Sequence, residues 1–137
     1  MPLQLSILTP QGAVFEGPVD SVLVPGSEGD FGVLPEHERF LTPVRIGELA
    51  IQSGGRSRYA AIAEGFADVS AHAVSVLAEA CELADDIDAA RAELAQQRAE
   101  QGLAALPRDA EAARVLEYEA ALERARNRLA VSRRGGP

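Results

Sequence analysis

The chain has 137 residues, of which 47% are hydrophobic and 4% are aromatic, and it carries a formal net charge of −8 at pH 7. That length suits one domain, or one small domain with an appendage. The negative charge argues against nucleic-acid binding, which needs a basic surface. Cys81 is the single cysteine, which excludes an internal disulfide. No uncharged apolar run approaches the roughly 18 residues of a membrane span, so any membrane association must come through partners.

Residues 1–83 are predicted to form about ten short β-strands separated by turns. Leu3, Leu5 and Ile7 alternate with polar residues, and this period of two indicates a strand with one buried face. Further strands are expected at residues 13–16, 19–24, 31–34, 41–45, 48–52, 58–63, 66–70 and 73–80. A turn is expected at residues 64–66. Closely spaced strands with no helical stretch between them predict a β-sandwich or barrel.

The composition changes after Leu83. Ala, Glu, Gln, Arg and Leu dominate the rest of the chain, and all of them favour helix. A first helix is expected at about residues 87–101, with Asp85 or Asp86 as its N-cap and Gly102 marking its end.

A second helix is expected from a cap at Asp109 to about Val131. Its apolar residues form a narrow stripe with alternating spacings of three and four, and they are Val115, Tyr118, Leu122, Ala125 and Leu129. Helices of this length are marginal alone, so they must pack on a neighbour. The sequence therefore predicts an α+β fold, with a β-sandwich domain (1–83) followed by an antiparallel two-helix hairpin domain (84–137).

Familiar catalytic motifs are missing from the sequence. It has no Gly-rich phosphate loop ending in Lys-Ser/Thr, no Gly-x-Ser-x-Gly, no His-Glu-x-x-His and no Cys-x-x-Cys. The two histidines, His37 and His72, are far apart and have no cysteine partner. We therefore expect neither a metal site nor an enzymatic activity of the chain's own.

Three motifs in order resemble those of a known family. Residues 26–37 read GSEGDFGVLPEH, residues 87–92 read IDAARA, and residues 124–129 read RARNRL. These runs are similar to motifs of the epsilon subunits of F-type ATP synthases, which are called delta in mitochondria. The resemblance covers essentially the whole chain, which is thereby identified as a member of this family.

The resemblance implies a non-catalytic subunit of the rotor that couples proton translocation to ATP synthesis. The sandwich would bind the gamma subunit of the central stalk and the membrane rotor ring, with Glu28 and His37 at the ring contact. The subunit would therefore lie peripherally on the cytoplasmic face of the bacterial plasma membrane. Its C-terminal helices would inhibit ATP hydrolysis by extending along gamma toward the alpha and beta catalytic subunits.

The family also implies ATP as a regulatory ligand, with no cofactor required. The matching positions are Glu82, Asp88, Arg91, Arg98, Arg124 and Arg128. Within each helix the two arginines are one or two turns apart, so a folded hairpin could direct all four guanidinium groups at a polyphosphate. The plainer interpretation is that these residues form solvated faces and weak surface ion pairs.

Two other interpretations stay open at this point. The chain could be a free-standing nucleotide-sensing module that uses the same hairpin, or a β-sandwich adaptor with a coiled-coil tail. Residues 124–134 hold five arginines and no acid. This basic end could face phosphate or solvent, or it could dock on an acidic segment of the catalytic subunits.

Overall fold

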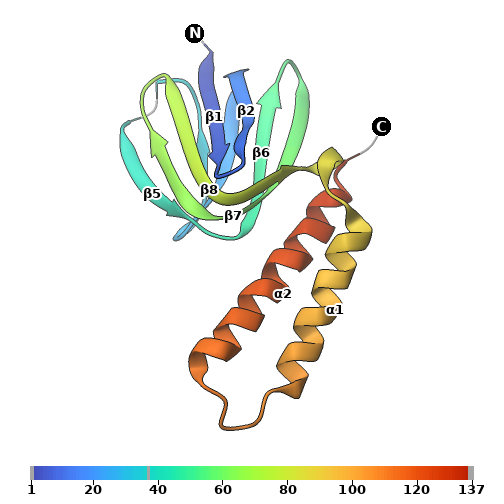
Figure 1. Cartoon of the computed structure of the whole chain (residues 1–137). Helices are drawn as coiled ribbons and strands as arrows, with labels where there is room; N and C mark the ends of the chain where they lie inside the picture. Colours follow the sequence, from blue (N-terminus) through green and yellow to red (C-terminus); the bar gives the residue numbers. More distant parts are fainter. Residues whose placement is uncertain (1, 37, 136–137) are drawn as a thin grey trace.

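The computed structural model describes residues 2–36 and 38–135 and consists of a β-sandwich from which a helical hairpin projects (Figure 1). Its elements follow in the order β1 (Leu3–Thr9), β2 (Gly12–Val19), β3 (Ser21–Gly26), β4 (Gly29–Val33), β5 (Phe40–Val44), β6 (Gly47–Ser53), β7 (Arg56–Val69), β8 (Ala73–Leu83), the 3-10 helix η1 (Ala84–Asp86), α1 (Ala89–Ala105) and α2 (Ala112–Ser132). The predicted α+β fold, with a β-sandwich and a two-helix hairpin, is confirmed.

The long strands β7 and β8 take part in both layers of the sandwich. One half of β7 pairs with β6, and the other half pairs with β5. The first half of β8 pairs in parallel with β1, which in turn pairs with β2. On the other side, β6 pairs with β3, and β3 pairs with β4. The two layers are therefore joined by continuous strands.

The turn expected at residues 64–66 is instead a bend inside β7. The strand runs through Glu64, which has a positive φ of 24°, and continues to Val69. Gly65 is needed here because a Cβ atom would lie 1.9 Å from the carbonyl oxygen of Leu77 on the neighbouring strand. The prediction of a turn was wrong because Gly65 allows β7 and β8 to lie close together and does not end the strand. The strands expected at residues 58–63 and 66–70 thus form one strand. This is one reason why the described residues contain eight strands, where about ten were expected.

The sandwich has a core of aliphatic side chains. Leu3, Leu5 and Ile7 of β1 are fully buried, as their alternation predicts. They pack with valines, leucines and isoleucines from both layers in one cluster of buried residues. No buried polar or charged residue occurs in the described part of the chain, so this interior depends on apolar packing alone.

Helix α1 begins and ends later than its sequence suggests. Its N-cap is Asp88, whose Oδ1 accepts a hydrogen bond from the Arg91 backbone N–H at 3.1 Å, and not Asp85 or Asp86. Those two acids lie in η1. Gly102 does not end the helix but lies at the contact with α2, where a Cβ atom would be 2.2 Å from Cε1 of Tyr118. The glycine is thus a packing position, and α1 continues to Ala105.

Helix α2 is preceded by Glu111, which makes no side-chain capping bond, and not by the expected cap Asp109. The predicted stripe does face inward, with burial that increases along the helix. Val115 and Tyr118 are half-buried, whereas Ala125 and Leu129 are buried. The end of α2 near the sandwich is therefore the better packed end.

The hairpin is attached to the sandwich mainly through α2. Val131 has no exposed surface and forms a small cluster with Ala61 and Ala84. Nearby, the Asn127 Nδ2 donates a hydrogen bond to the Gly47 carbonyl oxygen at 2.7 Å. No hydrogen bond or ion pair within the described residues joins α1 to the strands, so α1 is held by α2 and by η1.

Within the described ranges, no helix is both long enough and apolar enough to cross a lipid bilayer.

Candidate functional site

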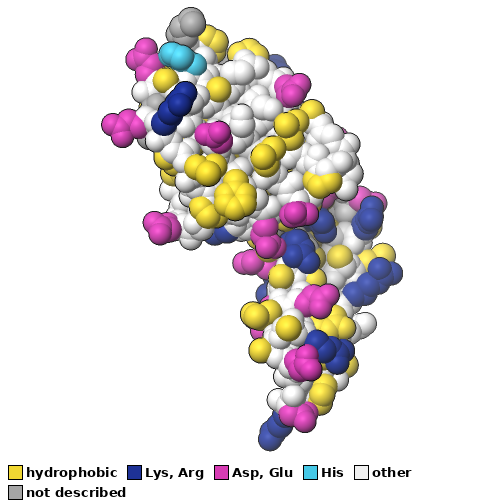
Figure 2. Space-filling model, turned by 60° about the vertical axis from the view of Figure 1, so that its left-hand side comes forward, with side chains coloured by type: hydrophobic (Ala, Val, Ile, Leu, Met, Phe, Trp, Pro, Cys, Tyr) yellow, Lys and Arg dark blue, Asp and Glu magenta, His cyan; other side chains and the backbone are white. Residues whose placement is uncertain are grey.

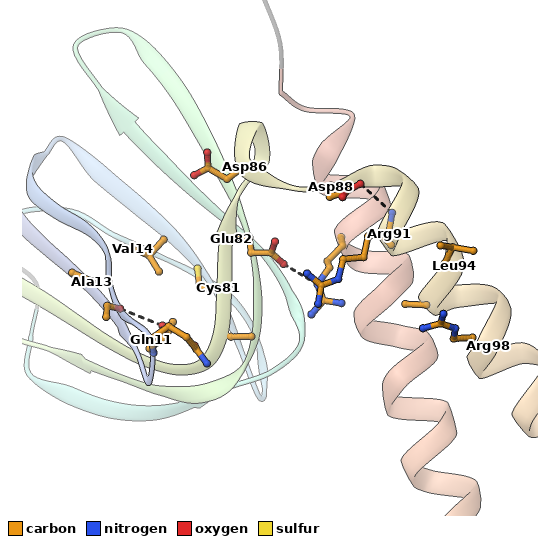
Figure 3. A pocket seen from close by; sticks show the side chains of 16 residues that line it. Gln11, Ala13, Val14, Cys81, Glu82, Asp86, Asp88, Arg91, Leu94 and Arg98 are labelled. Atoms are coloured by element: carbon orange, nitrogen blue, oxygen red, sulfur yellow. Dashed lines mark hydrogen bonds and ion pairs between the residues drawn. The ribbon is translucent and has the colours of Figure 1, made fainter.

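A cleft of about 1000 Å³ separates α1 from the sandwich (Figure 3). Its strand wall comes from the β1–β2 turn and the end of β8, and its helix wall comes from α1 and one residue of α2. The lining residues are Thr9, Gln11, Gly12, Ala13, Val14, Ala80, Cys81, Glu82, Asp86, Asp88, Arg91, Ala92, Leu94, Ala95, Arg98 and Arg128. The cleft exists because α2 docks on the strands while α1 does not.

Two arginines on one face of α1 carry the positive charge of the helix wall. Arg91 and Arg98 are seven residues apart, which is two helical turns, and both line the cleft. Across residues 2–36 and 38–135, neither guanidinium takes part in an ion pair. Unpaired guanidinium groups facing one cleft favour a ligand with anionic oxygens, which they can bind with bidentate hydrogen bonds.

Arg128 contributes a third guanidinium from α2. Its Nε donates a hydrogen bond to Oε1 of Glu82 at 2.9 Å, so it also ties α2 to the end of β8. Arg128 can therefore act both in docking the helix and in binding an anion.

Arg124 lies one turn earlier and outside the main cleft. Its Nη1 donates to Oε1 of Glu64 at 3.4 Å, and it lines a smaller adjoining recess together with Glu82 and Arg128. The structure thus gathers Glu82, Asp88, Arg91, Arg98 and Arg128 around one cleft and places Arg124 beside it.

The carboxylates of the cleft are partly engaged. Asp88 caps α1, and Glu82 is paired with Arg128, while Asp86 is an exposed residue of η1. An anion in the cleft would therefore have to sit closer to Arg91 and Arg98 than to Asp86.

Cys81 contributes an uncharged thiol to the strand wall. Burial raises the pKa of this thiol to about 12, with a smaller contribution from the neighbouring Glu82 carboxylate. A thiol with so high a pKa stays protonated at neutral pH and is a poor nucleophile. Cys81 therefore acts here as a small apolar surface.

Sequence reasoning missed the wall formed by the β1–β2 turn, which includes Thr9, Gln11 and Val14. The predicted strands leave a turn between Ile7 and Ala13, but no local signal shows that this turn lies opposite a helix that begins about 80 residues later. Asp86 was predicted as a helix cap and lies in the cleft instead.

The second predicted site is only partly described. Glu28 is exposed in the β3–β4 turn, where the Ser27 backbone N–H donates to the Pro43 carbonyl at 3.0 Å. That turn lies beside the C-terminal end of β5. Glu36 instead precedes the start of β5, where its backbone N–H donates to the Ala71 carbonyl at 2.6 Å. His37 lies outside the described residues, so a shared surface with Glu28 stays a prediction.

The charged groups that line the cleft are three arginines, Arg91, Arg98 and Arg128, and three carboxylates, Glu82, Asp86 and Asp88. No group of three or more His, Cys, Asp or Glu residues in the described ranges is placed to hold a metal ion. Reversible binding of an anionic molecule is the chemistry that this arrangement supports.

Family models match both parts of the chain. Residues 2–84 match the model "ATP synthase, Delta/Epsilon chain, beta-sandwich domain", and residues 85–133 match "ATP synthase, Delta/Epsilon chain, long alpha-helix domain". The chain is 45% identical over 129 residues to the ATP synthase epsilon chain of Nitratidesulfovibrio vulgaris (strain DP4), covering 94% of each chain. It is 40% identical over 126 residues to that of Desulforamulus reducens, covering 92% of this chain and 93% of the relative.

Solved structures share the fold at lower identity. A chain of the Euglena gracilis mitochondrial ATP synthase, in a structure of OSCP/F1/c-ring, superposes with a TM-score of 0.76 at 22% identity, covering 92% of this chain and 78% of that chain. A chain of the Tetrahymena thermophila mitochondrial ATP synthase central stalk and c-ring gives a TM-score of 0.63 at 11% identity, covering 96% and 97%.

Proposed function

The chain belongs to the ATP synthase delta/epsilon chain family, and from that premise we propose that it is a non-catalytic rotor subunit whose hairpin regulates ATP hydrolysis. The observation that carries this proposal is the separate packing of the two parts. The sandwich has its own aliphatic core, whereas the hairpin contacts it through a small cluster around Val131, one hydrogen bond and partly exposed ion pairs. A rigid part can thus stay bound to a partner while the other part detaches.

An exposed apolar row on the sandwich supports docking to the gamma subunit of the central stalk. Neighbouring strands align Pro43, Phe66, Leu77 and Leu8 side by side across the sheet. Phe66 and Leu77 are 54% and 56% exposed, respectively. Figure 2 shows hydrophobic side chains, including an aromatic ring, on the surface of the sandwich. Exposed apolar side chains in a continuous row favour burial against a partner.

The acidic residues beside this row indicate the kind of surface that fits it. Glu64 and Asp68 flank Phe66 on β7, and Glu79 follows Leu77 on β8 with its side chain exposed. We therefore expect the partner surface to be apolar, with basic side chains at its border.

Substitution of the row tests the docking. Phe66→Glu should abolish recovery of gamma in a pull-down because it places a charge in the middle of the apolar contact. Leu116→Glu is the matched control, since Leu116 is a 63% exposed hydrophobic residue on α2. Equal recovery of gamma by both variants would remove this surface from the proposal, and failure of the unaltered chain to bind gamma would favour a free-standing module.

In the proposed regulatory cycle, the docked hairpin permits ATP hydrolysis and the released hairpin extends along gamma to block it. At ~1.5 Å per residue, α2 alone spans roughly 30 Å. ATP in the cleft would favour the docked form only through a higher affinity for that form. The arginines at the cleft support this role, and Arg91→Ala should abolish the heat of ATP binding in calorimetry.

Attachment to the rotor ring would hold the subunit peripherally at the cytoplasmic face of the bacterial plasma membrane, with Glu28 and His37 at the ring. This placement rests on family membership and is tested by co-purification with ring subunits.

Removal of the hairpin tests the regulatory role directly. A complex reconstituted with a subunit that ends before Asp85 should assemble normally and hydrolyse ATP faster than the complete complex. Unchanged hydrolysis by the truncated complex would contradict the proposed inhibition, whereas loss of assembly would show that the hairpin is needed for docking.

A further inference from the structure

One outer face of β7 and β8 carries both the docked hairpin and the exposed apolar row. Ala63 of β7 and Ala80 of β8 pair with each other and line the small recess under α2. Phe66 and Leu77 of the apolar row form a pair three residues further along β7. At about 3.3 Å per residue, the row begins ~10 Å from the patch that α2 covers. A partner that docks on the row therefore borders the docked hairpin.

Glu64 lies at this boundary, and the bend in β7 sets its side chain there. Ala60 and Ile62 face the core before the bend. Ala67 and Val69 face the core after it. A regular strand would direct residue 64 inward after residue 62, because inward positions alternate. Glu64 instead has a φ of 24° and a side chain that is 61% exposed. The bend thus places a carboxylate on the outer face, between the hairpin and the row.

A second carboxylate, that of Glu79, lies across from Glu64 on β8. The register of β7 and β8 on either side of the bend places the two residues opposite each other. Like charges at opposing positions of paired strands repel. Arg124 of α2 forms an ion pair with Glu64, whereas no ion pair reaches Glu79 within residues 2–36 and 38–135. The docked hairpin therefore neutralises one carboxylate of an acidic pair beside the apolar row.

The contact between Arg124 and Glu64 is the outermost contact of the hairpin with the sandwich. Among the described residues, Arg124 is the first residue of α2 that donates a hydrogen bond to a strand, and Asn127, Arg128 and Arg134 follow. Its distance of 3.4 Å is the longest of the four. Exposed ion pairs contribute little stability, so a cation from another molecule can displace Arg124 at little cost. Figure 2 shows acidic and basic side chains where the hairpin meets the sandwich, next to hydrophobic ones.

We infer that Glu64 is shared between the hairpin and gamma, and that a basic side chain at the border of the docked gamma surface displaces Arg124 from it. This inference rests on the proposed docking of gamma to the apolar row. Because two cations compete for one carboxylate, gamma and the hairpin weaken each other's docking, and the effect is equal in both directions. Binding of the sandwich to gamma thus itself favours release of the hairpin.

The affinity of the full chain for the gamma subunit, measured by surface plasmon resonance, tests this competition. Glu64→Gln should weaken gamma binding by about twofold to fivefold, the effect of one exposed ion pair. Arg124→Gln should tighten gamma binding by a similar factor, because it leaves Glu64 free for gamma. In the Glu64→Gln background, Arg124→Gln should have no effect, since the shared carboxylate is absent. High salt should reduce these differences, because it screens exposed charges.

Arg126→Gln is the matched control. Arg126 is an exposed arginine of α2 that forms no ion pair within the described part of the chain, so this variant should bind gamma normally. The inference is overturned if Arg124→Gln leaves gamma binding unchanged, if Arg126→Gln tightens it equally, or if Arg124→Gln acts equally in the Glu64→Gln background. Any of these results, with Phe66→Glu still losing gamma, would leave the proposed docking in place. If the unaltered chain does not bind gamma, the proposed docking fails together with this inference.

Discussion

The sandwich and the helical hairpin are stabilised by different kinds of contact. The sandwich buries leucine, isoleucine and valine side chains from both of its layers in one cluster. The hairpin brings small residues of α1, such as Ala92 and Ala99, to its inner face. At Gly102, the Tyr118 ring packs directly on the α1 backbone. The helices thus lie close together but bury little apolar surface.

The contacts that attach the hairpin to the sandwich are weaker than the contacts within either part. Full burial of a valine such as Val131 stabilises by about 1.5–3 kcal/mol. The ion pairs of Arg124, Arg128 and Arg134 with acids of the sandwich are partly exposed, and such pairs contribute about 0–1 kcal/mol each. A ligand present at 100 times its dissociation constant supplies about 2.7 kcal/mol. A ligand that bound only the docked form, as proposed above, would therefore supply free energy of the same order as any one of these docking contacts.

The largest expected effect belongs to the sandwich core. Leu5→Ala removes a fully buried side chain and should lower the free energy of unfolding by about 2–5 kcal/mol, measured by urea denaturation. Leu8→Ala on the same strand is the control, since Leu8 is 36% exposed, and it should cost much less. Similar losses for the two variants would contradict the assignment of the core.

Next in size is release of the hairpin. Val131→Asp should detach it by placing a carboxylate in an apolar cluster, and limited proteolysis at η1 should become faster while the sandwich unfolds at its usual temperature. Ala130→Asp adds the same charge at the neighbouring exposed position and should leave proteolysis unchanged. If Val131→Asp instead unfolds the sandwich together with the hairpin, the two parts are not separable.

The helix–helix contact gives a smaller effect. Gly102→Ala places a methyl group against the Tyr118 ring, and overpacking of this kind costs about 1–3 kcal/mol. The higher helix propensity of alanine offsets about 0.5–1 kcal/mol of that cost. Thermal melting of the helical circular dichroism signal should therefore shift down modestly. Adding Tyr118→Leu should recover part of the shift if the clash with the ring is the cause.

The smallest effect concerns the C-terminal end of α2. Arg134 donates two hydrogen bonds to Glu48 at 3.1 and 3.2 Å and lies over the Tyr59 ring at 4.6 Å. Glu48→Gln should weaken hairpin docking by at most about 1 kcal/mol. Hydrogen exchange at η1 measures the difference in docking between the variant and the unaltered chain. High salt should remove this difference, since salt screens exposed charges. A difference that persists in high salt would point to the shape of the contact instead of its charge.

Local patterns were sufficient to predict much of this architecture. The alternation of Leu3, Leu5 and Ile7 depends only on neighbours in sequence, and so does the stripe of α2. The spacing of Arg91 and Arg98 also predicts that they share a face of α1, and the structure places both at the cleft.

Contacts between distant segments could not be predicted in this way. Gly65 and Gly102 look like turn and stop signals, but each allows close approach of a residue on the next strand or helix. Arg124 and Arg128 carry no local sign that Glu64 and Glu82 would be their partners. The strand wall of the cleft arises in the same manner, because the β1–β2 turn meets α1 only in the folded chain.

Native-state hydrogen exchange, followed by mass spectrometry with and without ATP, tests most directly whether the hairpin moves independently of the sandwich. We expect amides of η1 and of both helices to exchange many times faster than those of β1 and β8, because local release needs far less free energy than global unfolding. ATP should slow exchange in the hairpin, and in the sandwich it should affect only the strand ends that line the cleft. Equal protection of helices and core strands, with loss of both in one step, would contradict the account.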